Sequence, residues 1–344
     1  MYLRKLFLTL SILIFLFSQC GETQVSYQQK INLVTVKDTI SSTSNLLNDS
    51  LVLDTALYNK LVLYLAHNKQ TGKWPVKTKY PLTGAILPFK RIITYYGNFY
   101  STHMGILGEL SPDVMLDQLN TEVKKWTFAD TVLPVQPALE YIAVTAQRNP
   151  GKDDMYRLRM PFNQIEKALE LCRKINAILI LDVQVGHCSL SQELPALLPY
   201  LKMENVHLAI DPEYSMKSGA VPCSEIGTFD ADDINYASDY LAQIVRDYNL
   251  PPKILVVHRF TKAMVTNYKN ITTKPEVQII INMDGFGFPA KKIDTYKSWI
   301  AGEPVQFTGF KLFYQNDIKS PPHRLMTPDE IIRLNPSPIY IQYQ

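Results

Sequence analysis

Three apolar segments of the sequence each end in two polar residues that are separated by a single residue. The pairs are Asp211 and Glu213 after residues 206–210, Asp182 and Gln184 after 178–181, and Asn282 and Asp284 after 279–281. Side chains of a β-strand alternate between its two faces, so the members of each pair should point the same way. Apolar strands with polar pairs at their carboxyl ends are typical of a parallel barrel with an active site at that end.

Carboxyl groups that lie close together suit acid–base chemistry. Asp211 and Asp182 belong to neighbouring predicted strands and would lie about 5 Å apart if the strands are in register. Close carboxylates raise one another's pKa, which would keep Glu213 protonated. Cleavage of a glycosidic bond needs such a protonated carboxyl group and a second group across the bond. The sequence therefore predicts a glycoside hydrolase-like site with Glu213, Asp211 and Asp182 as catalytic residues.

The other predicted strand ends and the loop after the first strand supply hydroxyl, amide, aromatic and charged side chains. We expect the following residues to bind the ligand: Tyr95, Tyr96, His103, Glu109, Gln184, His258, Asn282, Asp284, Lys311 and Tyr314. Rings can stack on the faces of sugars, while carboxyl and amide groups form hydrogen bonds with hydroxyls. The expected ligand is a carbohydrate or another polyhydroxylated molecule.

Two other functions stay open on the same residues. A metal-dependent hydrolase would use Asp182, Asp211, Glu213, Asp284 and His258 as ligands for Mg²⁺ or Ca²⁺. The six histidines form no His-x-His pair and no Cys-x-x-Cys spacing is present, so a zinc site is not expected. The glycosidase hypothesis itself requires no cofactor. A non-catalytic glycan-binding or envelope-scaffold lipoprotein is the third hypothesis.

Strand and helix patterns alternate from residue 91 onward. Strands are predicted at 91–97, 139–146, 177–186, 206–213, 253–260, 277–285, 308–314 and 339–343, and the clearest helices at 112–126, 163–176, 230–248 and 289–300. This alternation indicates a parallel sheet. Residues 91–344 match the ~250 residues of a typical (β/α)8 TIM barrel. A doubly wound sheet would carry a glycine-rich phosphate loop after its first strand, and residues 95–100 form none.

The first 90 residues are expected to lie outside the barrel. Arg4 and Lys5 precede an apolar run at 6–17 that is shorter than the ~20 residues of a membrane-spanning helix. With Cys20 the run resembles a bacterial lipoprotein signal, which implies a signal peptide at 1–19 and export to the cell envelope on a lipidated Cys20. Gln19 departs from the small residue usual there, so simple secretion, or an uncleaved anchor, stays open. Residues 20–50 suit a flexible tether, and 51–90 a helix with an irregular lead-in.

The charge and the cysteines add two expectations. A net charge of +3 is too small to favour a nucleic-acid partner. Cys188 and Cys223 follow neighbouring predicted strands, on the same face of the barrel, and an exported protein can oxidise its thiols. A disulfide between them is one expectation, and two free thiols are the other.

Two resemblances follow from these motifs. Residues 210–214, Ile-Asp-Pro-Glu-Tyr, resemble the end of the fourth strand in chitinase-like glycosidases. That resemblance implies that Glu213 is the acid and that Asp211 positions the acetamido carbonyl of the substrate, although Ala209 and Val206 stand where further acids are expected. Segments 104–109, 255–261, 284–287 and 309–314 resemble bacterial lipid-anchored barrel proteins of uncharacterised activity, which supports the domain limits and export and implies no reaction.

Overall fold

The structure is a computed structural model that describes residues 52–344. The expected signal peptide at 1–19, the lipidation site Cys20 and the tether at 20–50 lie outside the described residues. Between residues 52 and 344, no helix is both long and apolar enough to cross a membrane.

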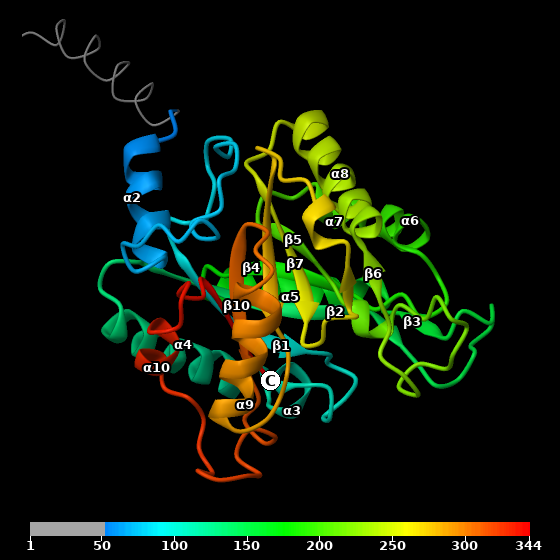
Figure 1. Cartoon of the computed structure of the whole chain (residues 1–344). Coiled ribbons are helices and arrows are strands. Elements are labelled where there is room, and N and C mark those ends of the chain that lie inside the picture. The colour runs from blue at the N-terminus through cyan, green and yellow to red at the C-terminus, as the bar shows by residue number, and fades with distance from the viewer. Residues whose placement is uncertain (1–51) are drawn as a thin grey trace, which may run out of the picture. The chain divides into compact units, whose positions relative to one another are not determined.

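Eight parallel strands of the described chain close into a barrel (Figure 1). They are β1 (Arg91–Gly97), β2 (Val135–Ala146), β4 (Ile178–Val183), β5 (Val206–Ile210), β7 (Lys253–Arg259), β9 (Val277–Met283), β10 (Phe307–Leu312) and β11 (Tyr340–Tyr343). Each strand pairs in parallel with the next of this series, and β11 pairs with β1 to complete the circle. The predicted (β/α)8 barrel is confirmed, with all eight strands in the predicted regions.

Helices connect successive strands on the outside of the barrel (Figure 1). They are α3 (Ile106–Glu109), α4 (Pro112–Ala129), α5 (Phe162–Lys174), α6 (Leu190–Glu193), α7 (Leu198–Leu201), α8 (Ala231–Tyr248), α9 (Pro289–Thr295), continued by a π-helical turn (Tyr296–Ala301), and α10 (Pro328–Ile332). Asp230 and Thr327 form capping boxes that start α8 and α10, because their side chains satisfy backbone N–H groups of the first turn. In the described chain, the connection from β7 to β9 has no α-helix and contains β8 (Val265–Thr266) and the 3-10 turn η4 (Tyr268–Asn270).

Several short strands and turns lie in the connections between the barrel strands. β3 (Arg157–Arg159) pairs antiparallel with the end of β2. β6 (Phe229–Asp230) and β8 (Val265–Thr266) form a separate two-stranded sheet. A second 3-10 turn, η2 (Leu194–Leu197), joins α6 to α7.

Apolar side chains form two layers of core. The outer layer lies between strands and helices and includes the buried Leu119 and Trp126 of α4. The inner layer fills the barrel with residues such as Ile92, Ile180 and Ile280. The inward and outward positions alternate along each strand, as the period of two requires.

Helix α2 (Thr55–Leu65) packs against the amino-terminal end of the barrel. Its Leu61 and Leu65 belong to the same cluster as the barrel interior, and the Leu65 carbonyl accepts a hydrogen bond from Ser337 N, just before β11. Asp54 caps the helix by accepting from Leu57 N at 2.8 Å. The predicted helix in this region is confirmed, and its position leaves the carboxyl ends of the strands open.

Five of the eight strands, β4, β5, β7, β9 and β10, end earlier than predicted. β5 stops at Ile210 and is followed by the 3-10 turn η3 (Pro212–Tyr214). Asp211 Oδ1 accepts a hydrogen bond from Glu213 N at 3.0 Å, and Pro212 has no N–H to continue the ladder. Strand alternation therefore does not place Glu213, and that part of the prediction is wrong, although the turn still brings Glu213 to the barrel mouth.

The predicted disulfide is not formed in this structure. Cys188 and Cys223 are both free thiols. Cys188 is half-buried and hydrogen-bonds to the Glu193 carboxylate, whereas Cys223 is exposed in the loop after β5. Cys188 therefore lies in the ionic cluster of Glu193 with Arg157 and Arg159.

Candidate active site

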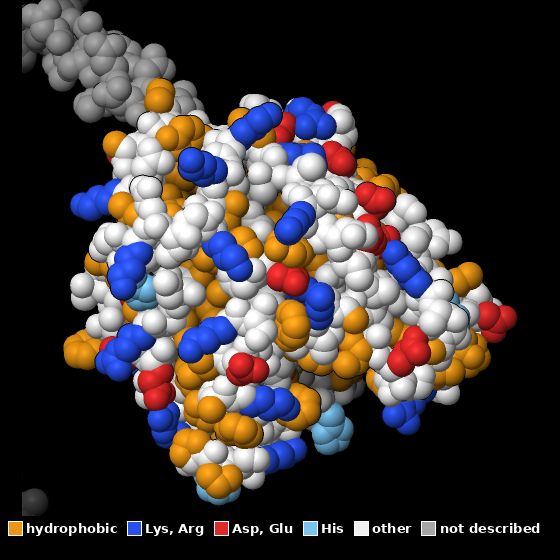
Figure 2. Space-filling model, viewed as in Figure 1, with side chains coloured by type: hydrophobic (Ala, Val, Ile, Leu, Met, Phe, Trp, Pro, Cys, Tyr) orange, Lys and Arg blue, Asp and Glu red, His pale blue; other side chains and the backbone are white. Residues whose placement is uncertain are grey.

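A cavity of about 560 Å³ opens at the carboxyl ends of the strands. Seven of the predicted site residues line it: Tyr96, His103, Gln184, Asp211, Glu213, Asp284 and Lys311. Further walls come from aromatic side chains after β5, β7, β9 and β10, namely Tyr214, Phe260, Phe286 and Phe313. The expected mixture of acids, amides and rings at one mouth is therefore present, and we call this space the mouth cavity. Basic and acidic side chains are both spread over the face of the molecule seen in Figure 2.

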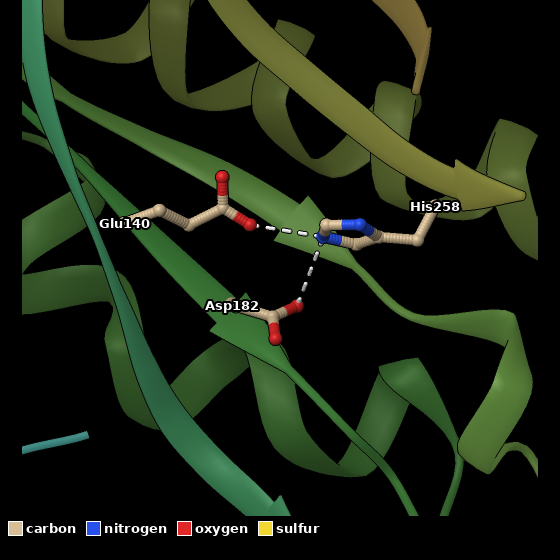
Figure 3. A group of neighbouring side chains, drawn as sticks. All are labelled: Glu140, Asp182 and His258. Carbon is tan, nitrogen blue, oxygen red and sulfur yellow. Dashed lines mark hydrogen bonds and ion pairs between the residues drawn. The ribbon is translucent and has the colours of Figure 1, made fainter. Parts of the chain in front are cut away.

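Three fully buried side chains meet beside the mouth cavity, in the barrel interior (Figure 3). His258 Nε2 lies 2.9 Å from Glu140 Oε1 and 3.9 Å from Asp182 Oδ1. The three residues come from β7, β2 and β4, so only closure of the barrel brings them together. None of the three lines the mouth cavity. Asp182, which was predicted to be catalytic, is fully buried and is not part of the cavity wall; its catalytic role stays a prediction.

The other nitrogen of His258 connects this group to the mouth cavity. His258 Nδ1 lies 3.0 Å from Asp284 Oδ2. The second oxygen of Asp284 lies 2.9 Å from the Lys311 ammonium. Carboxyl, imidazole, carboxylate and ammonium groups thus alternate from Glu140 to Lys311, and each group is oriented by its neighbours.

Tyr96 closes the network from the side of β1. Its hydroxyl donates to Asp182 Oδ2 at 3.0 Å and accepts from Gln184 Nε2 at 3.3 Å. The Lys311 ammonium lies 3.9 Å from the centroid of the Tyr96 ring, a distance at which the ring face attracts a cation. Tyr96 therefore holds two of the charged groups at fixed positions.

Two carboxyl groups of the mouth cavity have pKa values that are displaced in opposite directions. Burial, and then repulsion from Asp284, raises the pKa of Glu213 to about 7. Burial would raise the pKa of Asp284 as well, but the positive charges of Lys311 and His258 outweigh it and hold that pKa at about 2. Near neutral pH, Asp284 is ionised while a large fraction of Glu213 is protonated. No hydrogen bond or ion pair to the Glu213 carboxyl group is found among residues 52–344, so it is free to meet a ligand.

The surrounding groups follow the same electrostatics. Burial raises the pKa of Asp182 to about 6 and raises that of Asp211 well above its usual range, in both cases against the attraction of His258. Burial alone would lower the pKa of His258, but Asp284 and Glu140 raise it well above 6.5. His258 is thus an imidazolium, and it is the positive charge around which the carboxyl groups are arranged.

Glu140, Asp182 and His258 also offer a set of donor atoms that lie within 4.8 Å of one another. One imidazole with two carboxylates suits zinc or another transition metal better than Mg²⁺ or Ca²⁺, which prefer oxygen. Both nitrogens of His258 also face carboxyl oxygens, Glu140 Oε1 at 2.9 Å and Asp284 Oδ2 at 3.0 Å. A histidine binds a metal only through an unprotonated nitrogen, so a metal ion and a proton would compete for the nitrogen that faces Glu140 and Asp182.

Comparison of the sequence with protein-family models and with curated proteins gives no match. Among solved structures, the chain is similar to a ruminal GH26 endo-β-1,4-mannanase at 12% identity, covering 74% of this chain and 59% of that one with a TM-score of 0.35. It is also similar to a GH5-4 broad specificity endoglucanase from an uncultured bovine rumen ciliate (12% identity, 67% and 76% coverage, TM-score 0.35). A dihydropteroate synthase of Burkholderia cenocepacia is similar to the same degree (11% identity, 76% and 87% coverage, TM-score 0.37). The likenesses assign no activity, because the barrel carries many unrelated reactions.

Five of the predicted ligand-binding residues do not line the mouth cavity: His258, described above, and four others. Tyr95 and Tyr314 face the helices, where their hydroxyls lie 2.9 Å apart. Adjacent residues of a strand face opposite sides, so Tyr95 points outward where Tyr96 points inward. Tyr314 lies two residues beyond the end of β10 and its ring stacks on that of Tyr343. Glu109 ends the short helix α3 after β1, outside the mouth cavity, and its carboxylate accepts a hydrogen bond from Gln315 Nε2 at 2.9 Å. Asn282 is fully buried in the barrel and donates to Gln342 Oε1 at 2.9 Å.

Glu140 belongs to the buried network around His258, and the sequence prediction missed it. It is a single acid within the apolar segment 138–144, two residues from Ala138 and Ile142, which share its face. The register pairs Glu140 with Tyr96 of β1, so a residue in the middle of the long β2 stands level with the end of β1. An inward-facing acid inside an apolar strand was the available signal.

Proposed function

We propose that the barrel is a glycoside hydrolase in which Glu213 is the general acid. The observation that carries the proposal is the pair of carboxyl groups in one cavity, Glu213 and Asp284, with pKa values of about 7 and about 2. Groups whose environments separate their pKa values in this way can serve as proton donor and ionised partner at one pH. Glycosidic bond cleavage requires that combination.

The chemistry assigns a role to each group. Protonated Glu213 gives its proton to the glycosidic oxygen as the bond from that oxygen to the anomeric carbon breaks. The Asp284 carboxylate faces the positive charge that develops on the sugar, with its orientation fixed by His258 and Lys311. A water molecule then adds to the anomeric carbon and its proton returns to Glu213. Asp211 acts in this scheme by holding the η3 turn that carries Glu213.

The apolar walls support a carbohydrate ligand. Phe286 and Phe313 lie with ring centroids 6.0 Å apart and nearly perpendicular planes, and Phe286 is 56% exposed. An exposed ring beside hydrogen-bonding carboxyl and amide groups can cover the apolar face of a sugar while its hydroxyls reach the polar wall. The site thus offers both contacts that a pyranose requires.

The test measures release of reducing ends from glycans by three proteins: wild type, Glu213→Gln and Glu166→Gln. Glutamine keeps the shape of Glu213 and removes only its proton, so turnover should fall about 10²–10⁴-fold. Glu166 is exposed on α5, and the same substitution there should leave turnover unchanged. Full turnover in Glu213→Gln would move the acid to another residue, whereas tight binding of a glycan with no turnover in wild type would support the glycan-binding scaffold instead.

We also propose that the protein is exported and held at the cell envelope by a lipid on Cys20. The sequence order of basic residues, apolar run and cysteine supports this proposal, and an envelope location would place the barrel among extracellular or cell-wall glycans. Metabolic labelling with a fatty-acid probe tests it. Label in the wild type that is lost in Cys20→Ser is the expected result, and equal labelling of both would refute lipidation.

A further inference from the structure

A second cavity lies next to the mouth cavity. It measures about 190 Å³ and shares four wall residues with the mouth cavity: His103, Phe313, Asn316 and Gln344. Thr102, Glu109 and Gln315 belong to the second cavity alone. Because the two spaces share walls, one ligand can occupy both. We call the second cavity the side groove.

The side groove lies across the barrel from Glu213. Its walls follow β1, β10 and β11, whereas Glu213 follows β5. Around the circle of eight strands, β5 and β11 are separated by four steps in either direction. Figure 1 shows α3 next to the carboxyl-terminal end of the chain, where this groove is formed. A ligand that contacts both Glu213 and the side groove must therefore span the mouth.

The wall of the side groove is tightly built. Gly105 has a φ of +119°, and a Cβ atom there would lie 2.4 Å from the Tyr96 carbonyl oxygen. At Gly108 a Cβ atom would lie 2.2 Å from the Asn98 carbonyl oxygen. The loop after β1 folds back on itself so closely that only glycine fits at these positions. The hydrogen bond from Gln315 to Glu109 then joins this segment to the loop after β10, so both sides of the groove are connected.

We propose that the side groove is a second sugar-binding site, and that the substrate is a neutral glycan chain rather than a single sugar. This inference rests on the proposed hydrolase function. Hydroxyl, amide and carboxyl groups of Thr102, Gln315 and Glu109 can exchange hydrogen bonds with sugar hydroxyls. No lysine or arginine lines the groove among the described residues, and the Glu109 carboxylate would repel an anionic sugar. Lys319 donates to Asn316 Oδ1 at 2.6 Å but is not one of the lining residues.

The test measures binding by titration calorimetry with the Glu213→Gln protein, so that the ligands are not cut. The probes are cello-, manno- and chito-oligosaccharides of one to six units, with oligogalacturonides as the anionic series. For the neutral series that binds best, affinity should rise about tenfold or more with chain length, as a few additional hydrogen bonds would give. Adding Gln315→Ala should remove this gain and leave the affinity for the single sugar unchanged. Adding Gln243→Ala instead, on the exposed side of α8, should change neither the gain with chain length nor the affinity for the single sugar.

Each contrary outcome separates the groove from the hydrolase. Four results would each overturn the proposal that the side groove binds sugar. They are affinity that is independent of chain length, a gain with chain length that survives Gln315→Ala, a preference for galacturonides, and no binding of any neutral oligomer. If the wild type still hydrolyses a glycan in the first three cases, the hydrolase proposal stands alone. Chain-length-dependent binding without hydrolysis by the wild type would keep the groove and refute the catalytic role of Glu213.

Discussion

Replacing Glu213 with glutamine should stabilise the protein above neutral pH, although Glu213 is the proposed catalytic acid. Its pKa is raised from 4.5 to about 7 by burial and by repulsion from Asp284. The folded protein therefore binds this proton more tightly than the unfolded chain does. The stability that comes from the bound proton is complete below pH 4.5 and is lost as the pH rises to about 7.

The size of the effect follows from the shift. The difference between about 7 and 4.5 is about 2.5 pKa units, and at 1.36 kcal/mol per unit this gives about 3 kcal/mol. Glutamine fills the same space without a charge. The free energy of unfolding of Glu213→Gln should therefore exceed that of wild type by up to about 3 kcal/mol at pH 8. The two proteins should be nearly equal at pH 4.

Urea denaturation at intervals from pH 4 to pH 9 measures both curves. Glu330→Gln is the matched control, because Arg324 and the helix cap lower the pKa of Glu330 to about 2. That control should lose stability instead of gaining it, and only where Glu330 is ionised in wild type. If Glu213→Gln is no more stable than wild type at pH 8, the carboxyl group is not held in the environment described here, and the assignment of Glu213 as the acid loses its physical basis.

Three further predictions concern the surrounding charges and the conditions of activity. His258→Gln should raise the pKa of Asp284, because it removes one of the two positive charges that lower it. The acid limb of the profile of kcat/KM against pH should then move upward by a pH unit or more. If the acid limb does not move, Lys311 alone sets the pKa of Asp284. In wild type, the buried Lys292 ammonium lies 2.7 Å from an Asp317 carboxylate oxygen. Asp317→Asn leaves this ammonium unpaired and should lower the free energy of unfolding, measured by urea denaturation, by about 3–5 kcal/mol. Adding Lys292→Met should recover most of the loss. In wild type, kcat/KM should fall above pH about 7, where Glu213 loses its proton, and a plateau through pH 9 would contradict its role as the acid.

Much of the barrel could be predicted from the sequence, because buried parallel strands are continuous apolar runs and helices carry local capping signals. The segment 277–283 is such a run and forms β9 as expected. The strand ends could not be predicted as well. The apolar run of this strand ends at Ile210, and the prediction extended the strand to Glu213 by assuming that the alternation of faces continues. The Asp211 side chain and Pro212 instead start a turn there, because such local hydrogen bonds compete with the sheet.

The sequence predicted which kinds of residue form the candidate site better than it predicted how they contact one another. Asp211, Glu213 and Asp284 do line one cavity, since carboxyl ends of parallel strands meet at one end of a barrel. Which of these carboxyl groups is ionised depends on neighbouring side chains from strands that are distant in the sequence. Asp284 is ionised because Lys311 and His258 contact it, and neither contact can be inferred from sequence spacing.

The barrel interior explains why one carboxyl group can remain protonated beside another that is ionised. Five carboxyl groups surround two cations in the network, namely Glu140, Asp182, Asp211, Glu213 and Asp284 around His258 and Lys311. Two positive charges balance two negative ones, so ionising all five groups would leave three uncompensated charges in a space of low dielectric. The free-energy cost of ionisation is highest for carboxyl groups that lack a direct contact with a cation. Asp284 contacts both cations and keeps its charge, whereas Glu213 contacts neither and keeps its proton, and Glu213 is the one of these two groups whose carboxyl remains unbonded at the cavity wall.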